Sequence, residues 1–239
     1  MVDSAIAIFV FLFGGVGLLA VPWLLKRWRN RTPSVRMPTL DELRRTAKLL
    51  VVDDKEFDFL DSLKQSGYKV KSVADISTTK DIEAGAYDLV LIDLSGIGAG
   101  ISKEQGLGVI RQVKSASPAQ VVIAYSAARW PLATSNDVRI ADVVIDKARV
   151  MFPEFREIVD AQVLKSASLV YYVDSLAAIT SMCNRQRVSD QLARYIADRE
   201  GSHLESIVQD LGLDPGDGAI PSVHSIAKIA KIRLRKWMN

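Results

Sequence analysis

Asp88–Asp93 (DLVLID) is a short run of aliphatic, partly β-branched residues that ends on an acid. Runs of the same kind lie on both sides of it along the chain: Lys48–Asp54 (KLLVVDD), Val70–Ala74, Val121–Ser126 (VVIAYS) and Ala141–Lys147 (ADVVIDK). Short apolar runs separated by segments of helical period are typical of buried parallel strands in βα units. The sequence therefore predicts an α/β fold with a doubly wound, five-stranded parallel sheet.

Polar side chains stand at the ends of four of these runs. The carboxyl ends of parallel strands lie along one edge of a sheet, which is where ligands bind. Three crowded carboxylates repel one another and favour a bound cation, and all-oxygen ligation suits Mg2+. A lysine and a hydroxyl beside such a site fit phosphoryl transfer, in which positioning and charge neutralisation do most of the work. The residues that we expect to converge are Asp53, Asp54, Asp93, Ser126 and Lys147. The alternative is that each acid caps the helix after its strand.

These residues, in this order, resemble the receiver domain of two-component response regulators. The resemblance covers roughly Lys48–Leu164 and implies a flavodoxin-like sheet with Asp93 as the phosphoacceptor. It also implies that Mg2+ is held by Asp53 and Asp54, together with Asp93 and the backbone carbonyl of Ser95. A sensor histidine kinase or a phosphotransfer protein would then be the partner that supplies the phosphoryl group.

By the same resemblance, Ser126 would bond a phosphate oxygen and Lys147 would pair with the phosphoryl group. Four features depart from the pattern of the family. One is the segment 128–140 (ARWPLATSNDVRI), which carries a proline and has weak helical period. Ala148 follows Lys147 where the family has a proline, which leaves the lysine less constrained. Val144 stands where an aromatic switch residue is common, and this argues against the usual output surface. The connection Ser95–Gly106 (SGIGAGISKEQG) is longer and richer in glycine than is usual.

The N-terminus carries an uncharged apolar stretch, Ala5–Leu25, which is long enough to cross a bilayer as a helix. Basic residues follow it directly: Lys26, Arg27, Arg29 and Arg31. The positive-inside rule then places the N-terminus outside and the rest of the chain in the cytoplasm. We expect a single-pass anchor over residues 1–28 in the inner membrane. A cleaved signal peptide is the alternative, but it fits poorly because no basic segment precedes the apolar stretch.

Composition excludes several other classes of site. The net charge of the 239 residues is +3, and much of it comes from the basic cluster after Ala5–Leu25, so nucleic-acid binding is not favoured. The single cysteine, Cys183, excludes an internal disulfide and is expected to be a small core residue. His203 and His224 lie far apart with no companion cysteine, which argues against a zinc site.

The remaining segments suggest a linker and a helical region around the receiver, which we place at 47–165. Residues 29–46 read as a juxtamembrane linker, with a brief helix capped by Thr39 and Glu42. Residues 166–239 predict a small all-α unit. Helical period runs from Ser168 to Ala197 with few breaks, so we expect one long helix there into which the last receiver helix continues. For the final helix, Val223–Met238, the plainest reading is that its apolar side packs onto neighbouring parts of the chain. Three readings of this unit stay open. It is a helical output or dimerisation module, a DNA-binding helix-turn-helix, or a region whose last basic amphipathic helix lies on the inner leaflet.

The function predicted from the sequence is a membrane-anchored phosphoacceptor switch in phosphorelay signalling, with output through the C-terminal helices. Dimerisation of the chain is one route by which the C-terminal helices would transmit the signal. We expect no enzyme activity beyond slow self-dephosphorylation. The first alternative is a phosphorylation-independent pseudo-receiver that serves as a membrane scaffold. Less favoured alternatives are a membrane-tethered transcription regulator and a phosphatase of the haloacid dehalogenase type, which needs a second acid where Ser95 stands.

Overall fold

The computed structural model describes residues 33–126, 140–180, 183–198 and 203–238. The predicted anchor, residues 1–28 with the apolar stretch Ala5–Leu25, lies outside these described residues. Among the helices of the described ranges, none combines the length and the apolar character that a membrane span requires. Ser34–Asn239 forms one compact unit.

The sheet has five parallel strands: β1 Lys48–Val52, β2 Lys69–Val73, β3 Leu89–Asp93, β4 Val122–Ser126 and β5 Val143–Asp146. Their order is β2-β1-β3-β4-β5, and each neighbouring pair is parallel. This is the flavodoxin-like order of doubly wound sheets, so the predicted fold of the sheet is confirmed. The central strands β3 and β4 are buried along their whole length, whereas the edge strands β2 and β5 are partly exposed. Burial on both faces explains why the central strands read as continuous apolar runs.

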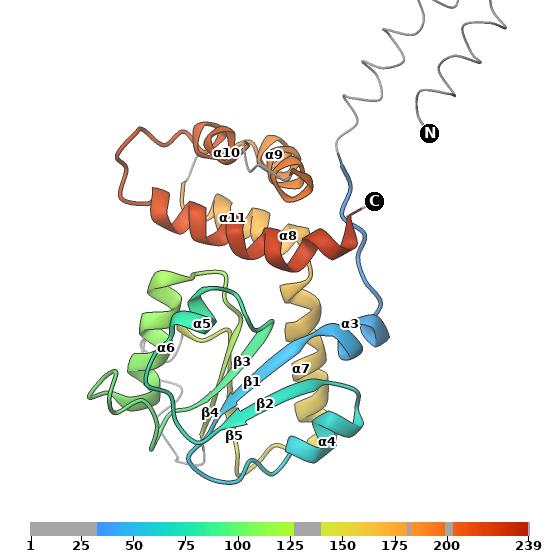
Figure 1. The fold of residues 1–239 in the computed structure, drawn as a ribbon, viewed down its shortest axis with the longest axis vertical. Helices are drawn as coiled ribbons and strands as arrows, with labels where there is room; N and C mark the ends of the chain where they lie inside the picture. The colour runs from blue at the N-terminus through green and yellow to red at the C-terminus, as the bar shows by residue number, and fades with distance from the viewer. Residues whose placement is uncertain (1–32, 127–139, 181–182, 199–202, 239) are drawn as a thin grey trace, which may run out of the picture. The chain divides into compact units, whose positions relative to one another are not determined.

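Helices cover both faces of the sheet (Figure 1). One face carries α3 (Leu40–Thr46), α4 (Leu60–Gln65) and α7 (Phe152–Ser166), and the other carries α5 (Lys80–Glu83) and α6 (Gln105–Ala116). Apolar side chains recur at helical spacing along α6, and Leu107, Ile110 and Val113 are buried there. Alternation along the strands divides the core into two clusters, one under each set of helices.

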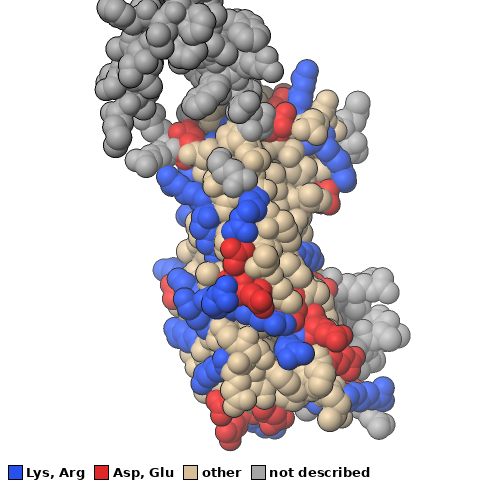
Figure 2. All heavy atoms as spheres, turned by 90° about the vertical axis from the view of Figure 1, so that its right-hand side faces the viewer, with Lys and Arg blue, Asp and Glu red and all other residues tan. Residues whose placement is uncertain are grey.

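The segment before the sheet is built into the unit. The capping box of α3 is present, with the Thr39 hydroxyl accepting from the Glu42 amide and the Glu42 carboxylate accepting from the Thr39 amide. Arg44 of α3 pairs with Asp160 of α7 at 2.5 Å, and the hydroxyl of Tyr68 donates to the same carboxylate at 2.5 Å. Figure 2 shows the face that carries α3 and α7, where basic and acidic side chains are interspersed.

The C-terminal region consists of α8 (Leu169–Ala177), α9 (Arg185–Ala197), α10 (Leu204–Asp210), α11 (Ile220–Leu234) and a short 3-10 helix, η2 (Arg235–Trp237). The long period after Ser168 predicted a continuous helix, but the structure has two helices, α8 and α9. The same period suggested that the last receiver helix continues into this region, and this is also wrong. Helix α7 ends at Ser166, whose carbonyl accepts a hydrogen bond from the Tyr172 hydroxyl of α8 at 2.7 Å.

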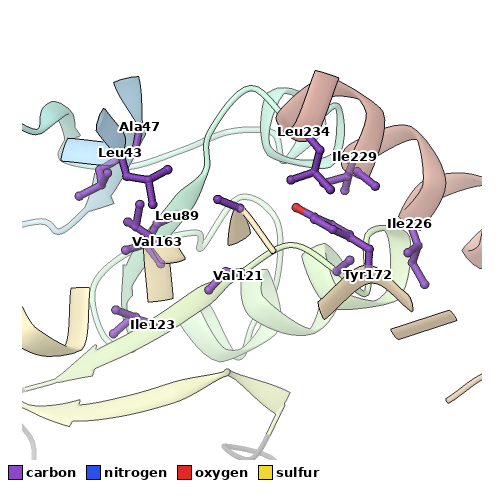
Figure 3. Close-up of a cluster of buried hydrophobic side chains, with 14 of the residues drawn as sticks. Leu43, Ala47, Leu89, Val121, Ile123, Val163, Tyr172, Ile226, Ile229 and Leu234 are labelled. Atoms are coloured by element: carbon purple, nitrogen blue, oxygen red, sulfur yellow. The ribbon is translucent and has the colours of Figure 1, made fainter. Parts of the chain in front are cut away.

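These helices share one core with the sheet. Side chains of the strands and of the C-terminal helices belong to a single buried cluster, which Figure 3 shows in close-up with Leu89, Val121, Tyr172, Ile226 and Leu234 among its members. Figure 1 shows α8 to α11 grouped at one end of the unit. An apolar side of α11 is therefore buried against the chain's own core, as the plainest reading of its amphipathic pattern predicted.

The two ends of the compact unit meet. Val35 forms an isolated antiparallel bridge with Met238, and the Arg36 amide donates to the Trp237 carbonyl at 2.8 Å. The guanidinium of Arg36 also lies 5.1 Å from the ring centroid of Trp237. The described part of the predicted linker is thus held against the C-terminus and against α7.

Candidate functional site

The predicted site residues come together at the carboxyl edge of the sheet. Asp93 closes β3 and Ser126 closes β4, while Asp53 and Lys147 directly follow β1 and β5. Parallel strands bring these positions to the same edge, as expected. They line a pocket of about 450 Å3 that contains every residue predicted for the site: Asp53, Asp54, Asp93, Ser95, Ser126 and Lys147.

Lys147 bridges two of the acids. Its ammonium lies 2.6 Å from Oδ2 of Asp53 and 2.6 Å from Oδ2 of Asp93. Both carboxylates are buried, at 3% and 6% exposure for the two residues, so a partner for their charge is needed. The lysine that the sequence placed beside a phosphoryl group therefore pairs with the predicted phosphoacceptor itself.

The three acids are arranged as a potential metal site. Carboxylate oxygens of Asp53, Asp54 and Asp93 lie within 4.8 Å of one another. Asp54 is exposed, and of the three it is the one for which no pairing with Lys147 is found. Hard oxygen ligands that face solvent suit Mg2+, which keeps several waters when it binds to protein carboxylates. The donor set therefore fits the predicted ion.

Backbone amides orient two of these carboxylates. The amide of Ser95 donates to Oδ1 of Asp93 at 3.2 Å, and the amide of Lys55 donates to Oδ1 of Asp53 at 3.1 Å. In each case the lysine takes the opposite oxygen, Oδ2. Ser95 lies at the pocket wall, where its backbone is next to the predicted phosphoacceptor. Ser126 is buried at the end of β4, and its carbonyl accepts from the Lys147 amide at 2.9 Å.

The long connection after Asp93 is anchored to the loop that follows β2. The Gly98 amide donates to Oδ1 of Asp75 at 2.6 Å, and Ile97 is fully buried. Gly96 has a φ of +79°, and a Cβ there would collide with the carboxylate of Asp54. The backbone conformation therefore favours glycine at this position, and a side chain there would displace the exposed carboxylate of Asp54, a predicted metal ligand.

Tyr125 belongs to the site and was missed by the sequence analysis. It pairs in register with Asp93 on the neighbouring strand, and its ring centroid lies 4.5 Å from the ammonium of Lys147. Burial raises the pKa of the Tyr125 phenol, and the nearby negative charges of Asp58, Asp53 and Asp93 raise it further. Tyr125 therefore stays neutral beside the acids. A sequence signal existed, because strand alternation puts residues 123 and 125 on one face and Ser126 on the other.

Val144 lies away from this constellation. It packs against the cluster under α5 and α6, whereas Tyr125 belongs to the cluster on the opposite face. Of the segment 128–140, for which the sequence showed only weak helical period, residues 128–139 lie outside the described residues.

Comparison with known proteins finds no matching family model and no matching curated protein. Solved structures of response regulators are similar to about half of the chain. A CheY-like receiver domain protein from Methanospirillum hungatei JF-1 has a TM-score of 0.41 and 21% identity, over 50% of this chain and 95% of that protein. The response regulator TrrA from Thermotoga maritima, in complex with Mg2+ and BeF, has a TM-score of 0.41 and 22% identity, over 49% and 99% of the two chains.

A longer protein is also similar. NtrX from Brucella abortus in complex with ADP has a TM-score of 0.43 and 22% identity, over 63% of this chain and 33% of that one. The fold assignment rests on the strand order of the sheet, because these TM-scores are too low to carry it.

Proposed function

We propose that this chain is a receiver-type phosphoacceptor switch in phosphorelay signalling, with Asp93 as the residue that takes the phosphoryl group. The observation that supports this most directly is the pairing of Lys147 with Asp93 at 2.6 Å beside the acid cluster. A buried carboxylate that faces a pocket and is oriented by a lysine is suited to attack a phosphorus atom. The attack forms a bond from an Asp93 oxygen to phosphorus, and the bond from phosphorus to the donor breaks.

The other site residues have supporting roles in this proposal. Asp53 and Asp54, with Asp93 and the backbone of Ser95, would hold Mg2+, which supplies charge neutralisation for the phosphoryl oxygens when it is bound. Lys147 neutralises a further oxygen. The donor would be a phosphohistidine on a sensor kinase or a phosphotransfer protein. We propose no turnover of an external substrate beyond slow loss of the phosphoryl group to water.

Output is proposed to pass through the C-terminal helices. The shared core joins α8 and α11 to the sheet, so a change in the strands is transmitted through packed side chains. Two chains would pair through this region when Asp93 is phosphorylated. A scaffold that needs no phosphoryl group remains the alternative, and the experiment below separates the two.

The test is phosphorylation of the compact unit, residues 34–239, with acetyl phosphate and Mg2+, followed by intact-mass measurement. We expect a gain of one phosphoryl group that is absent without Mg2+ and absent in Asp93→Asn. Asp58→Asn is the matched control, because Asp58 lines the same pocket but is not among the three clustered acids. A folded protein that binds Mg2+ but gains no mass with any phosphodonor would favour the scaffold.

We also propose that Ala5–Leu25 anchors the chain in the inner membrane, with the compact unit in the cytoplasm. The support is the apolar stretch with basic residues directly after it. The test is fractionation of the full chain after expression. It should stay in the membrane pellet after carbonate extraction, and the double variant Leu12→Arg with Leu18→Arg should not, whereas Leu12→Ala with Leu18→Ala should. Recovery of the unsubstituted chain in the carbonate supernatant would refute the anchor.

A further inference from the structure

We infer that Tyr125 is a positioning residue that holds the ammonium of Lys147 over Asp93. The inference rests on the proposed function, because it concerns the same phosphoacceptor site. It assigns to an aromatic ring the positioning of the lysine that takes part in the reaction. It also bears on an expectation from the sequence, in which Ala148 after Lys147 left the lysine less constrained than in the family. The constraint comes instead from the strand between the lysine and the phosphoacceptor.

The position of Tyr125 follows from strand register. Tyr125 on β4 pairs with Asp93 on β3 on one side and with Ile145 on β5 on the other. Lys147 comes two residues after Ile145, so alternation directs it to the face on which Tyr125 lies. To reach Asp93, the lysine side chain must cross β4, and the ring of Tyr125 lies where it crosses. The distance of 4.5 Å from the ammonium to the ring centroid is the result.

The ring is itself held by other aromatic side chains. Phe57 packs against it with the centroids 5.2 Å apart and the planes at 65°, and Phe155 packs against it at 5.9 Å and 56°. Phe57 and Phe155 also contact each other at 5.8 Å. These residues come from the loop after β1 and from α7. Since Tyr125 is only 3% exposed, its ring has little freedom to move.

The ring gives Lys147 a partner that the reaction does not use. The other two partners are carboxylate oxygens of Asp53 and Asp93, and a metal ion or a phosphoryl group would engage those same side chains. An ammonium is attracted to the face of an aromatic ring, most strongly where water is excluded. The ring therefore keeps the ammonium beside Asp93 when the carboxylates take other partners.

The charge state of Tyr125 agrees with this role. Burial and the surrounding carboxylates keep its phenol neutral, so its ring does not compete with the acids as an anion. The contact depends on the ring rather than on the hydroxyl. Phenylalanine should therefore replace tyrosine at this position, whereas an aliphatic side chain of similar size should not.

The experiment compares Tyr125→Phe and Tyr125→Leu with the unsubstituted unit of residues 34–239. Phe59→Leu is the matched control, because it removes a ring that contacts Phe57 and Phe155 but has no ring contact with Tyr125. Two quantities are measured: the rate of phosphorylation by acetyl phosphate, and the rate at which an amine-acylating reagent modifies Lys147, read by peptide mass. Modification of Lys165, which pairs with Asp142 at 2.7 Å, is the internal reference.

We expect Tyr125→Phe and Phe59→Leu to stay within about twofold of the unsubstituted protein in both rates. Tyr125→Leu should be phosphorylated about tenfold more slowly, and its Lys147 should be acylated at least about threefold faster. A purely structural role would lower stability without changing Lys147 reactivity relative to Lys165. Should Tyr125→Leu fail to fold, Tyr125→Met serves in the same comparison.

Two results would overturn the inference. One is an acylation rate of Lys147 that is the same in Tyr125→Leu as in the unsubstituted protein. The other is a fall in the phosphorylation rate that is as large in Tyr125→Phe as in Tyr125→Leu. The acylation measurement needs neither metal nor phosphodonor. If the unsubstituted protein is not phosphorylated, the proposed function fails, yet Lys147 reactivity still decides whether Tyr125 positions it.

Discussion

Lys147 pairs with Asp93 at 2.6 Å although a whole strand, β4, lies between the strands that carry them. The lysine side chain spans that width over the ring of Tyr125, and the same ammonium also reaches Asp53. One cation thus pairs with two of the three clustered acids. Without metal, this side chain is the cation that pairs with both buried carboxylates, and several consequences can be measured.

Removing the cation should destabilise the metal-free protein. In Lys147→Met, Asp53 and Asp93 would face each other as buried, unpaired carboxylates, so we expect the free energy of unfolding to fall by about 2 kcal/mol. Added Mg2+ should recover part of the loss. Urea unfolding with and without Mg2+ measures both effects. Lys103→Met, an exposed change of the same charge, is the control and should be nearly neutral. Equal stability of the two variants would contradict the pairing.

Asp54 should be needed for Mg2+ binding but not for the stability of the metal-free protein. It is exposed and adds a third negative charge, so Asp54→Asn should leave metal-free stability unchanged or slightly higher. In the unsubstituted protein, Mg2+ at ten times its dissociation constant should raise the free energy of unfolding by about 1.4 kcal/mol. That increase should disappear in Asp54→Asn and persist in Glu56→Gln, which changes another acid of the pocket wall. A persistent Mg2+ effect in Asp54→Asn would place the metal elsewhere.

Arg233 of α11 ties the C-terminal helices to the start of the central strands. Its guanidinium donates to the Tyr87 carbonyl at 2.5 Å, to Gln120 Oε1 at 2.7 Å and to the Tyr172 hydroxyl at 3.2 Å. Arg233→Met would leave these buried acceptors without their donor, so we expect a loss of about 3 kcal/mol in urea unfolding. Arg235→Met, at an exposed position two residues on, should change stability by less than about 0.5 kcal/mol.

The shared core predicts that the part with the sheet does not fold without the C-terminal helices. Removing residues 169–239 would expose apolar side chains that share the buried cluster with α8 and α11. We expect the fragment 34–168 to lack a cooperative unfolding transition by circular dichroism, whereas the unit 34–239 should show a single one. A folded, monomeric fragment with its own sharp transition would show instead that the helices are a separable module.

The stabilisation that the Glu42 carboxylate gives to the cap of α3 should be lost at acid pH. The hydrogen bond from Arg36, aided by the Thr39 amide, lowers the pKa of Glu42 from 4.5 to about 2. Because the folded pKa lies below the unfolded one, this carboxylate stabilises the fold above about pH 4.5, and the contribution is lost as the pH falls toward 2. The difference in unfolding free energy between the unsubstituted protein and Glu42→Gln should therefore be constant above pH 5 and shrink below it. A difference that is independent of pH would contradict the cap.

Much of the sheet could be predicted because its signals are local. Runs such as Asp88–Asp93 are short, apolar and β-branched, and the rule that parallel strands share a carboxyl edge needs no further knowledge of packing. The same rule brought Asp93, Ser126 and Lys147 into one pocket. Thr39 and Glu42 carried a cap that depends only on residues three apart.

The C-terminal helices were harder, because an apolar stripe does not say what it packs against. The stripe of α11 fits a partner protein, a bilayer or the chain's own sheet equally well, and the choice depends on contacts far apart in sequence. The break between α8 and α9 was also missed, because helical period continues through it. Arg233 looked like one more basic residue of the helix, since its acceptors come from positions 61 to 146 residues away in the sequence.

The sequence by itself thus determined the strands, their common edge and the set of charged residues that meets there, because strand alternation and the direction of parallel strands follow from local pattern. Only the tertiary structure decided which of those residues touch. The register of β4 between β3 and β5 places Tyr125 under Lys147, and the packing of α11 buries Arg233 at the opposite ends of the strands. Register and helix docking depend on how distant side chains fill one core, and no local pattern contains that information.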